Sequence, residues 1–217
     1  MPFPNTPILD TFDRANEGPP LSASWDYPTT SLNAGVMVLD TNVIKGNGVN
    51  DNDAYWKTSY GPDCEAYVTL VTWPIADANP GSVWLNLRST SVGAGGTGGA
   101  SINTYEVNIS SVGTATTLIV YQGLAGTYTT LSTQAIGSGI VSGDILGARI
   151  VGATIQAYIN GQPVGNPVQS STHIAAGVIG IGCGSSAIGR FDNFGGGTYA
   201  EVTGYDDGDS FQMVQGL

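Results

Sequence analysis

The sequence predicts an all-β fold, a two-sheet antiparallel sandwich, from three observations. Short segments of alternating apolar and polar residues recur along the chain, and none shows sustained helical periodicity. Glycine accounts for 32 of the 217 residues, and turn signals separate the apolar segments at short, regular intervals. Charged residues make up only 11% of the chain and hydrophobic residues 41%, which is enough for one large core.

Strands are expected wherever an alternating segment ends at a turn signal. Trp25 anchors the first. The strongest signal runs from Cys64 to Trp73, where even-numbered residues share one face and odd-numbered residues the other. In chain order, the other expected strands are 35–39, 42–45, 54–57, 82–88, 102–109, 116–122, 127–133, 144–151, 153–159, 162–164, 177–183 and 190–194. Asp40-Thr41 and Asn160-Gly161 are expected to form hairpin turns, and residues 91–101 an exposed glycine-rich loop.

Three regions are expected: an extended arm at 1–8, a folded domain at 9–195 and an acidic, aromatic arm at 196–217. The first arm holds three prolines, which favour an extended path over a neighbour or over the domain itself. Because a free tail seldom exposes many apolar groups, the second arm is expected to bind a partner, the alternative being a disordered tail. Its candidate contact residues are Tyr199, Tyr205, Phe211, Met213, Val214 and Leu217.

The charge balance argues against two classes of partner. With six basic residues and a net charge of −11, the chain lacks the basic surface that nucleic acids require. No apolar run approaches the roughly 18 residues of a membrane-spanning helix, so no membrane partner is expected. The first residues show neither the basic region nor the apolar core of a signal peptide, so we expect use without export. Cys64 and Cys183 are therefore expected to be buried free thiols rather than a disulfide.

Two segments carry a resemblance to a known family. The first is Leu9-Asp10-Thr11-Phe12-Asp13-Arg14, followed by Leu21 and Trp25, and the second is Arg190-Phe191-Asp192-Asn193-Phe194. They resemble the two ends of a concanavalin A-like (laminin G-like) jelly roll, in which a "DxFxR…L…W" opening lies beside an "RFDNF" closing strand. The resemblance covers about residues 9–195 and implies a jelly-roll sandwich.

No enzymatic activity is expected for this chain, because the catalytic motif of glycanases with this fold is missing. Glycanases of this fold typically carry E-x-D-x-E or E-x-D-x-x-E on one strand, a pattern missing here. Glu65 and Glu106 lie on expected strands, and we expect solvated outer-face residues, the alternative being a pair across neighbouring strands. The single histidine, His173, lies in a polar loop, and there is no G-x-S-x-G nucleophile elbow.

Calcium is the best chemical candidate, because members of this fold often bind it where the first and last strands meet. Asp10, Asp13, Asp192 and Asn193 supply oxygen ligands of the right kind, with Asn16 nearby. The alternative is that Asp10 and Asp192 only accept hydrogen bonds from loop amides. Two other acidic segments, 51–53 and 206–209, are weaker candidates.

A glycan site would need aromatic rings beside polar groups. The candidate rings are Trp56, Tyr60, Trp73, Trp84, Tyr105, Tyr121 and Tyr128. On alternating strands most of them are expected to pack in the core or on a sheet, so no glycan-binding residue is singled out.

The "FDRAN…L…W" opening also resembles jelly-roll domains of tailed-phage virion proteins. This resemblance implies a non-enzymatic structural protein: a capsid decoration, a head spike or a minor tail protein. Its partners would be other virion proteins or copies of itself, and its location the virion, assembled in the host cytoplasm. The alternative hypothesis is a lectin-like module that binds glycans.

Overall fold

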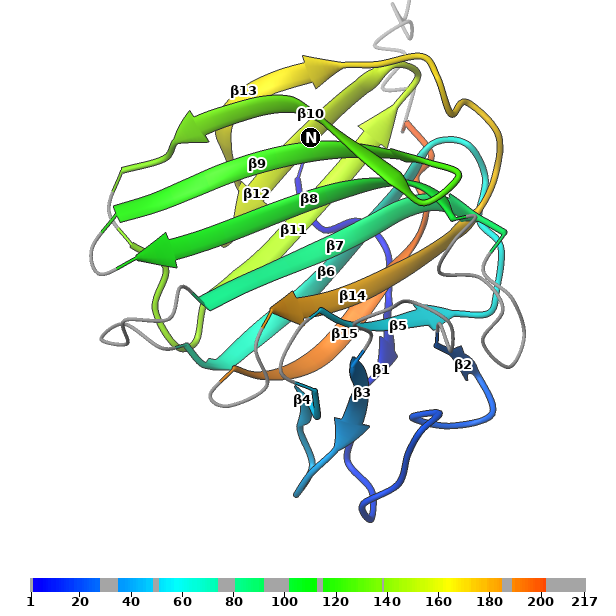
Figure 1. Cartoon of the computed structure of the whole chain (residues 1–217), viewed down its shortest axis with the longest axis vertical. Coiled ribbons are helices and arrows are strands. Elements are labelled where there is room, and N and C mark those ends of the chain that lie inside the picture. The colour runs from blue at the N-terminus through cyan, green and yellow to red at the C-terminus, as the bar shows by residue number, and fades with distance from the viewer. Residues whose placement is uncertain are drawn as a thin grey trace, which may run out of the picture.

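The computed structural model describes residues 2–27, 35–48, 51–73, 81–91, 102–112, 115–137, 139–184 and 189–201. Their elements are all strands (Figure 1). In order they are β1 (Ile8–Asp10), β2 (Trp25–Asp26), β3 (Gly35–Leu39), β4 (Ile44–Gly46), β5 (Asn52–Trp56), β6 (Cys64–Thr72), β7 (Gly81–Thr90), β8 (Asn103–Val112), β9 (Ala115–Leu124), β10 (Thr127–Ala135), β11 (Ile145–Val151), β12 (Thr154–Ile159), β13 (Gln162–Gln169), β14 (Val178–Gly184) and β15 (Arg190–Thr198). No helix that could cross a membrane is found among them.

The strands form two layers joined along one edge. The front layer in Figure 1 runs β10-β9-β8-β7-β14-β5, and the back layer runs β4-β15-β6-β11-β12-β13. Strand β3 connects the layers because it pairs with β5 on one side and with β4 on the other. The β3–β5 pair is parallel, an exception to the otherwise antiparallel arrangement. The predicted all-β sandwich is confirmed.

The core lies between the layers and follows from the alternation read in the sequence. Val83, Leu85 and Leu87 of β7 point into it, as do Val107 and Ile109 of β8, and all five are fully buried. From the back layer come Cys64, Ala66, Val68 and Leu70 of β6 and Leu146, Ala148 and Ile150 of β11. Since the other face of each front strand points away from this core, its side chains are free to build a surface.

The opening and closing segments lie side by side, as the resemblance implied. Strand β1 pairs antiparallel with β15, placing Asp10 opposite Phe194. The Asp10 carboxylate accepts hydrogen bonds from Arg14 Nη1 at 2.5 Å, from Trp25 Nε1 at 2.8 Å and from the Phe12 backbone N–H at 2.9 Å. One carboxylate therefore fixes the whole opening segment against the last strand.

Both expected hairpin turns are present. Strands β3 and β4 pair around Thr41 and Asn42, whose φ angles are 56° and 62°. Strands β12 and β13 meet at Asn160 and Gly161, with φ angles of 50° and 79°. Two consecutive left-handed residues match the twist of the flanking strands, which is why Asn-Gly favours this turn.

The N-terminal residues dock on the back layer of their own domain. Phe3 is buried and stacks on Tyr158 with ring centroids 4.1 Å apart. Its ring lies against Gly147, where a Cβ atom would come within 2.0 Å of it. Of the two paths expected for this arm, the structure shows the one over the domain itself.

Beneath this arm lies a buried ion pair that corrects the expectation for Glu65. Glu65 is fully buried, not solvated, and accepts hydrogen bonds from Arg149 Nε at 2.8 Å and Nη2 at 2.6 Å. Its second oxygen accepts from the backbone N–H and hydroxyl of Thr6, both at 2.8 Å. The same oxygen also accepts from the Asn5 backbone N–H at 2.5 Å, so the arm supplies three of the five hydrogen bonds that this buried carboxylate needs.

Strand β15 continues to Thr198, beyond the boundary expected at residue 195. Tyr199 follows and is buried with its ring 4.1 Å from the Arg149 guanidinium carbon. Outside the described residues lie the other candidate contact residues of the C-terminal arm, Tyr205, Phe211, Met213, Val214 and Leu217, and residues 92–101 of the expected glycine-rich loop.

Cys64 and Cys183 are buried free thiols, as predicted. Burial raises the pKa of each to about 12. Because the thiolate is the reactive form, we expect neither cysteine to react with a thiol reagent in the folded protein at neutral pH. Both should react after denaturation, which a colorimetric thiol assay with and without urea measures. Rapid labelling of the native protein would contradict the burial.

Candidate functional site

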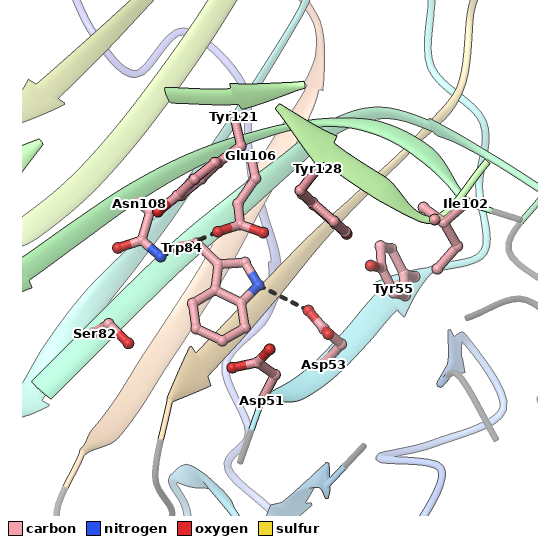
Figure 2. A pocket seen from close by; sticks show the side chains of 11 residues that line it. Asp51, Asp53, Tyr55, Ser82, Trp84, Ile102, Glu106, Asn108, Tyr121 and Tyr128 are labelled. Carbon is pink, nitrogen blue, oxygen red and sulfur yellow. Dashed lines mark hydrogen bonds between the residues drawn. The ribbon is translucent and has the colours of Figure 1, made fainter. Parts of the chain in front are cut away.

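The outer face of the front layer carries a pocket of about 420 Å³. It spans strands β5, β7, β8, β9 and β10 and is shown in Figure 2. Its lining residues are Asp51, Asp53, Tyr55, Ser82, Trp84, Ile102, Glu106, Asn108, Tyr121, Gly126 and Tyr128.

Strand alternation and register bring these side chains together. Trp84 and Glu106 point outward because their neighbours on β7 and β8 point into the core. The β7–β8 register places Trp84 opposite Asn108, and the β8–β9 register places Glu106 opposite Tyr121. Residues far apart in the sequence therefore share one surface of the sheet.

A glycine on β14 leaves room for a side chain of β7 to reach one of β5 across the sheet surface. Strand β14 lies between β5 and β7, and Gly182 on it pairs with Asp53 on one side and Trp84 on the other. A Cβ atom at Gly182 would lie 2.2 Å from Trp84 Nε1 and 2.5 Å from Asp53 Oδ1. Without that atom the indole lies across β14 and donates its N–H to Asp53 at 2.8 Å.

The two inner carboxyl groups, those of Asp53 and Glu106, have pKa values well above their ordinary values. Burial raises the pKa of Glu106 to about 8, and the carboxylates of Asp53 and Asp51 add to the effect. Burial likewise raises the pKa of Asp53 to about 6, opposed by its hydrogen bond from Trp84 and supported by the charge of Asp51. At neutral pH, Glu106 is mainly a neutral acid and Asp53 mainly a carboxylate.

One polar atom in the pocket wall has no protein partner. The Asn108 side chain donates from Nδ2 to Glu106 Oε1 at 3.1 Å. The other polar atom of this side chain, Oδ1, is buried and accepts no hydrogen bond. The residue as a whole is 8% exposed. Because an unpaired buried acceptor is costly, this atom points to a donor that a ligand would bring.

The structure brings the predicted calcium ligands to one edge but gives them other partners. Both Asp10 oxygens accept hydrogen bonds, from Arg14 and Trp25, and Asn16 accepts from the Thr41 backbone. Asp192 accepts from the backbone and side chain of Asn193, and burial, with Asp13 and Asp10 nearby, raises its pKa. Of the loop-amide hydrogen bonds that the alternative interpretation predicts, the structure shows one to each aspartate: the Phe12 backbone N–H donates to Asp10 and the Asn193 backbone N–H donates to Asp192. Calcium binding stays a prediction that would require Asp10 to exchange Arg14 for the ion.

Among the described residues, this edge included, no group of three or more His, Cys, Asp or Glu side chains is placed to hold a metal ion. His173 is half-buried, with Nε2 2.7 Å from the Gly123 carbonyl and its ring against Tyr105. It joins its own loop to strands β8 and β9 and does not line the pocket.

Glu106 corrects a second expectation. It is not a solvated outer-face residue, since it is only 9% exposed and lines the pocket. Nor does it pair with Glu65, which lies on β6 in the other layer. Its pocket partner is instead Asp53, from the acidic segment 51–53 noted only as a weak metal candidate.

The aromatic residues divide into three groups. Trp73 and Tyr105 are core residues, Trp56 and Tyr60 pack against the core, and Trp84, Tyr121 and Tyr128 line the pocket. The sequence identified these last three rings as candidates for a glycan site, but it did not place carboxyl groups beside them. The available signal was that Trp84, Glu106 and Asn108 all occupy the polar side of alternating strands.

No protein-family model and no curated protein matches this sequence. Solved structures with the same fold do match, at low identity. The carbohydrate-binding module CBM66 from Bacillus subtilis is 14% identical with a TM-score of 0.59, over 79% of this chain and 100% of that one. A Bacillus licheniformis beta-glucanase is 11% identical with a TM-score of 0.55, over 88% of this chain and 97% of that one.

A third neighbour is a Bacillus subtilis protein of unknown function with a galectin-like fold. It is 11% identical with a TM-score of 0.55, over 80% of this chain and 89% of that one. Together these structures confirm the expected jelly-roll sandwich. Identities this low show the fold alone, which hosts both binding modules and enzymes.

Proposed function

We propose that this protein binds glycans in the pocket on the outer face of the front layer. The observation that carries the proposal is the pocket's combination of aromatic rings with an amide acceptor that has no protein partner. A sugar presents an apolar C–H face that packs on rings and a rim of hydroxyl groups that donate and accept hydrogen bonds. The pocket supplies both kinds of contact within one enclosed space.

The neighbours favour this proposal over the virion role expected first from the sequence. One of them is by name a carbohydrate-binding module and covers most of this chain. The role expected first from the sequence, a structural protein of a tailed-phage virion, has no support from the neighbours described above. Detection of the protein by mass spectrometry in purified phage particles would test that location, and glycan binding would be compatible with it.

The binding proposal predicts a loss of affinity when one pocket ring is removed. A glycan array screened with the wild-type protein should identify saccharide ligands. Tyr121→Ala should then weaken the best of them by about tenfold or more, because a half-buried ring leaves the wall of the site. Thr129→Ala is the matched control: it changes an exposed residue on β10 that does not line the pocket.

If wild type and Tyr121→Ala bound the saccharide with equal affinity, the binding site would have to lie outside this pocket. A protein that binds no saccharide on the array, or in a pull-down with cell-wall polysaccharide, would contradict the proposed function itself.

Absence of polysaccharide cleavage remains a separate prediction. Along β8, alternate positions hold Glu106, Asn108 and Ser110, so only the first carries a carboxyl group. We therefore expect no release of reducing sugar from β-glucans, galactans or peptidoglycan. Release that disappears in Glu106→Gln would contradict this and make Glu106 and Asp53 an acid–base pair.

A further inference from the structure

The pocket is built from acceptors and rings, with no positive charge. Among the described residues its lining holds three carboxyl groups, those of Asp51, Asp53 and Glu106, and no lysine, arginine or histidine. The whole chain carries a net charge of −11, so nothing at longer range offsets this local excess. An anionic ligand, such as a sulfated or uronic acid sugar, would be repelled by this pocket.

Four aromatic rings surround the same space, those of Tyr55, Trp84, Tyr121 and Tyr128 (Figure 2). Tyr121 and Tyr128 meet edge to face with ring centroids 6.4 Å apart. A cation is attracted to the faces of such rings, most strongly to tryptophan and where water is excluded. Rings and carboxyl groups together form a site that favours a positively charged group.

The inner wall shows what that group would have to supply. Asn108 Oδ1 is a buried acceptor without a partner, and it lies on the same strand and face as Glu106. A protonated primary amine carries three donors and no acceptor. It can therefore donate to several acceptors of the pocket at once, which a hydroxyl group, with one donor, cannot.

We infer that the pocket recognises a saccharide through a protonated primary amine, as in an amino sugar whose nitrogen is not acetylated. This inference rests on the proposed glycan binding and names the substrate class. The amine would sit between the carboxyl groups of Asp53 and Glu106, with the sugar ring against Tyr121 and Tyr128.

Binding of this kind would release protons. Burial and neighbouring negative charge raise the pKa of Glu106 to about 8, so in the free protein at pH 7 the group is mainly a carboxylic acid. An ammonium group beside it favours the carboxylate, and the acid proton passes to the buffer as the ion pair forms. A neutral sugar does not favour the ionised form of Glu106, so its binding would leave the proton on the carboxyl group.

The test is a titration with three oligosaccharides of equal length and linkage: glucosamine, its fully N-acetylated counterpart, and glucose. Isothermal titration calorimetry at about pH 6, where the sugar amine is protonated, should give at least about tenfold tighter binding for the first. Repeating the titration in two buffers of different ionisation enthalpy should show release of up to about one proton per ligand for glucosamine only.

Glu106→Gln keeps the shape of the side chain and removes its acid. It should lower the affinity for the glucosamine oligosaccharide toward that for the acetylated one and reduce proton release to the smaller share that comes from Asp53, whose pKa is about 6. Thr129→Ala should change neither. A thermal melt of each variant shows that it is folded, and the wild-type proton count tests the inference without any variant.

The outcomes separate the inference from the proposed function. If all three oligosaccharides bind equally in the pocket, glycan binding stands and the amine inference falls. Equal binding without proton release would have the same meaning. If Nα-acetyl-lysine amide, an amine that is not a sugar, binds as tightly as the glucosamine oligosaccharide, amine recognition stands and the saccharide assignment falls.

Discussion

Trp25→Ala is expected to lower the free energy of unfolding by about 3–5 kcal/mol, the usual cost of truncating a large buried aromatic residue. Trp25 is completely buried, and its ring contacts those of Phe12, Trp56 and Phe194 at centroid distances of 6.0, 5.3 and 4.9 Å. The substitution also removes the N–H that Asp10 accepts. Urea denaturation of the two proteins measures the difference.

A second variant separates packing from hydrogen bonding. Trp25→Phe keeps an aromatic ring but loses the donor to Asp10 and part of the indole's volume, so we expect a smaller loss of about 1–2 kcal/mol. If Trp25→Ala left the unfolding midpoint unchanged, the ring would not hold the opening segment to β15.

The neighbours of Trp25 show how far sequence patterns reach. The opening and closing segments were predicted to meet, and β1 and β15 do pair. The sequence pattern also predicts that Trp25 lies between the sheets beside Phe12 and Phe191. Phe12 does contact Trp25, whereas the ring of the closing strand that contacts it is that of Phe194. Phe191 is buried in the same core. A register shift between Asp192 and Gly195 changes which side chains face inward, and no sequence period reveals such a bulge.

The candidate site was harder to predict because no single segment contains it. Each of its strands shows only that one face is polar, which is equally true of a solvated surface. The strand order β5-β14-β7-β8, and the small residue Gly182 between β5 and β7, place Asp53 within reach of Trp84. Strand order is a property of the whole chain. The separate positions of Asp53, Trp84 and Glu106 in the sequence therefore could not show that their side chains share one pocket.

Glu65 was misjudged for a related reason. Its strand alternation correctly placed it on the face opposite the core. What covers that face is the N-terminal arm, whose Thr6 donates twice to the carboxylate. The prolines of the arm indicated an extended path but carried no information about which surface it follows.

Raising the pH from about 5 to about 8 is expected to destabilise the protein through Glu106 and Asp53. Burial raises the pKa of Glu106 from 4.5 to about 8 and that of Asp53 from 3.8 to about 6. A group whose pKa is higher in the folded state binds its proton more tightly there. Its stabilisation is complete below the unfolded pKa and is lost as the pH rises through the folded one.

The free energy of unfolding should therefore fall by up to about 1.4 kcal/mol per pH unit for each group that is titrating. Between about pH 6 and 8 the fall should come mainly from Glu106, because Asp53 is by then largely ionised. Glu106→Gln should flatten the profile in that window, whereas Glu201→Gln, at an exposed position, should follow the wild-type curve. Urea denaturation at four pH values measures each slope. A wild-type profile as flat as that of Glu106→Gln would mean that Glu106 ionises freely and that the pocket is open to water at its inner wall.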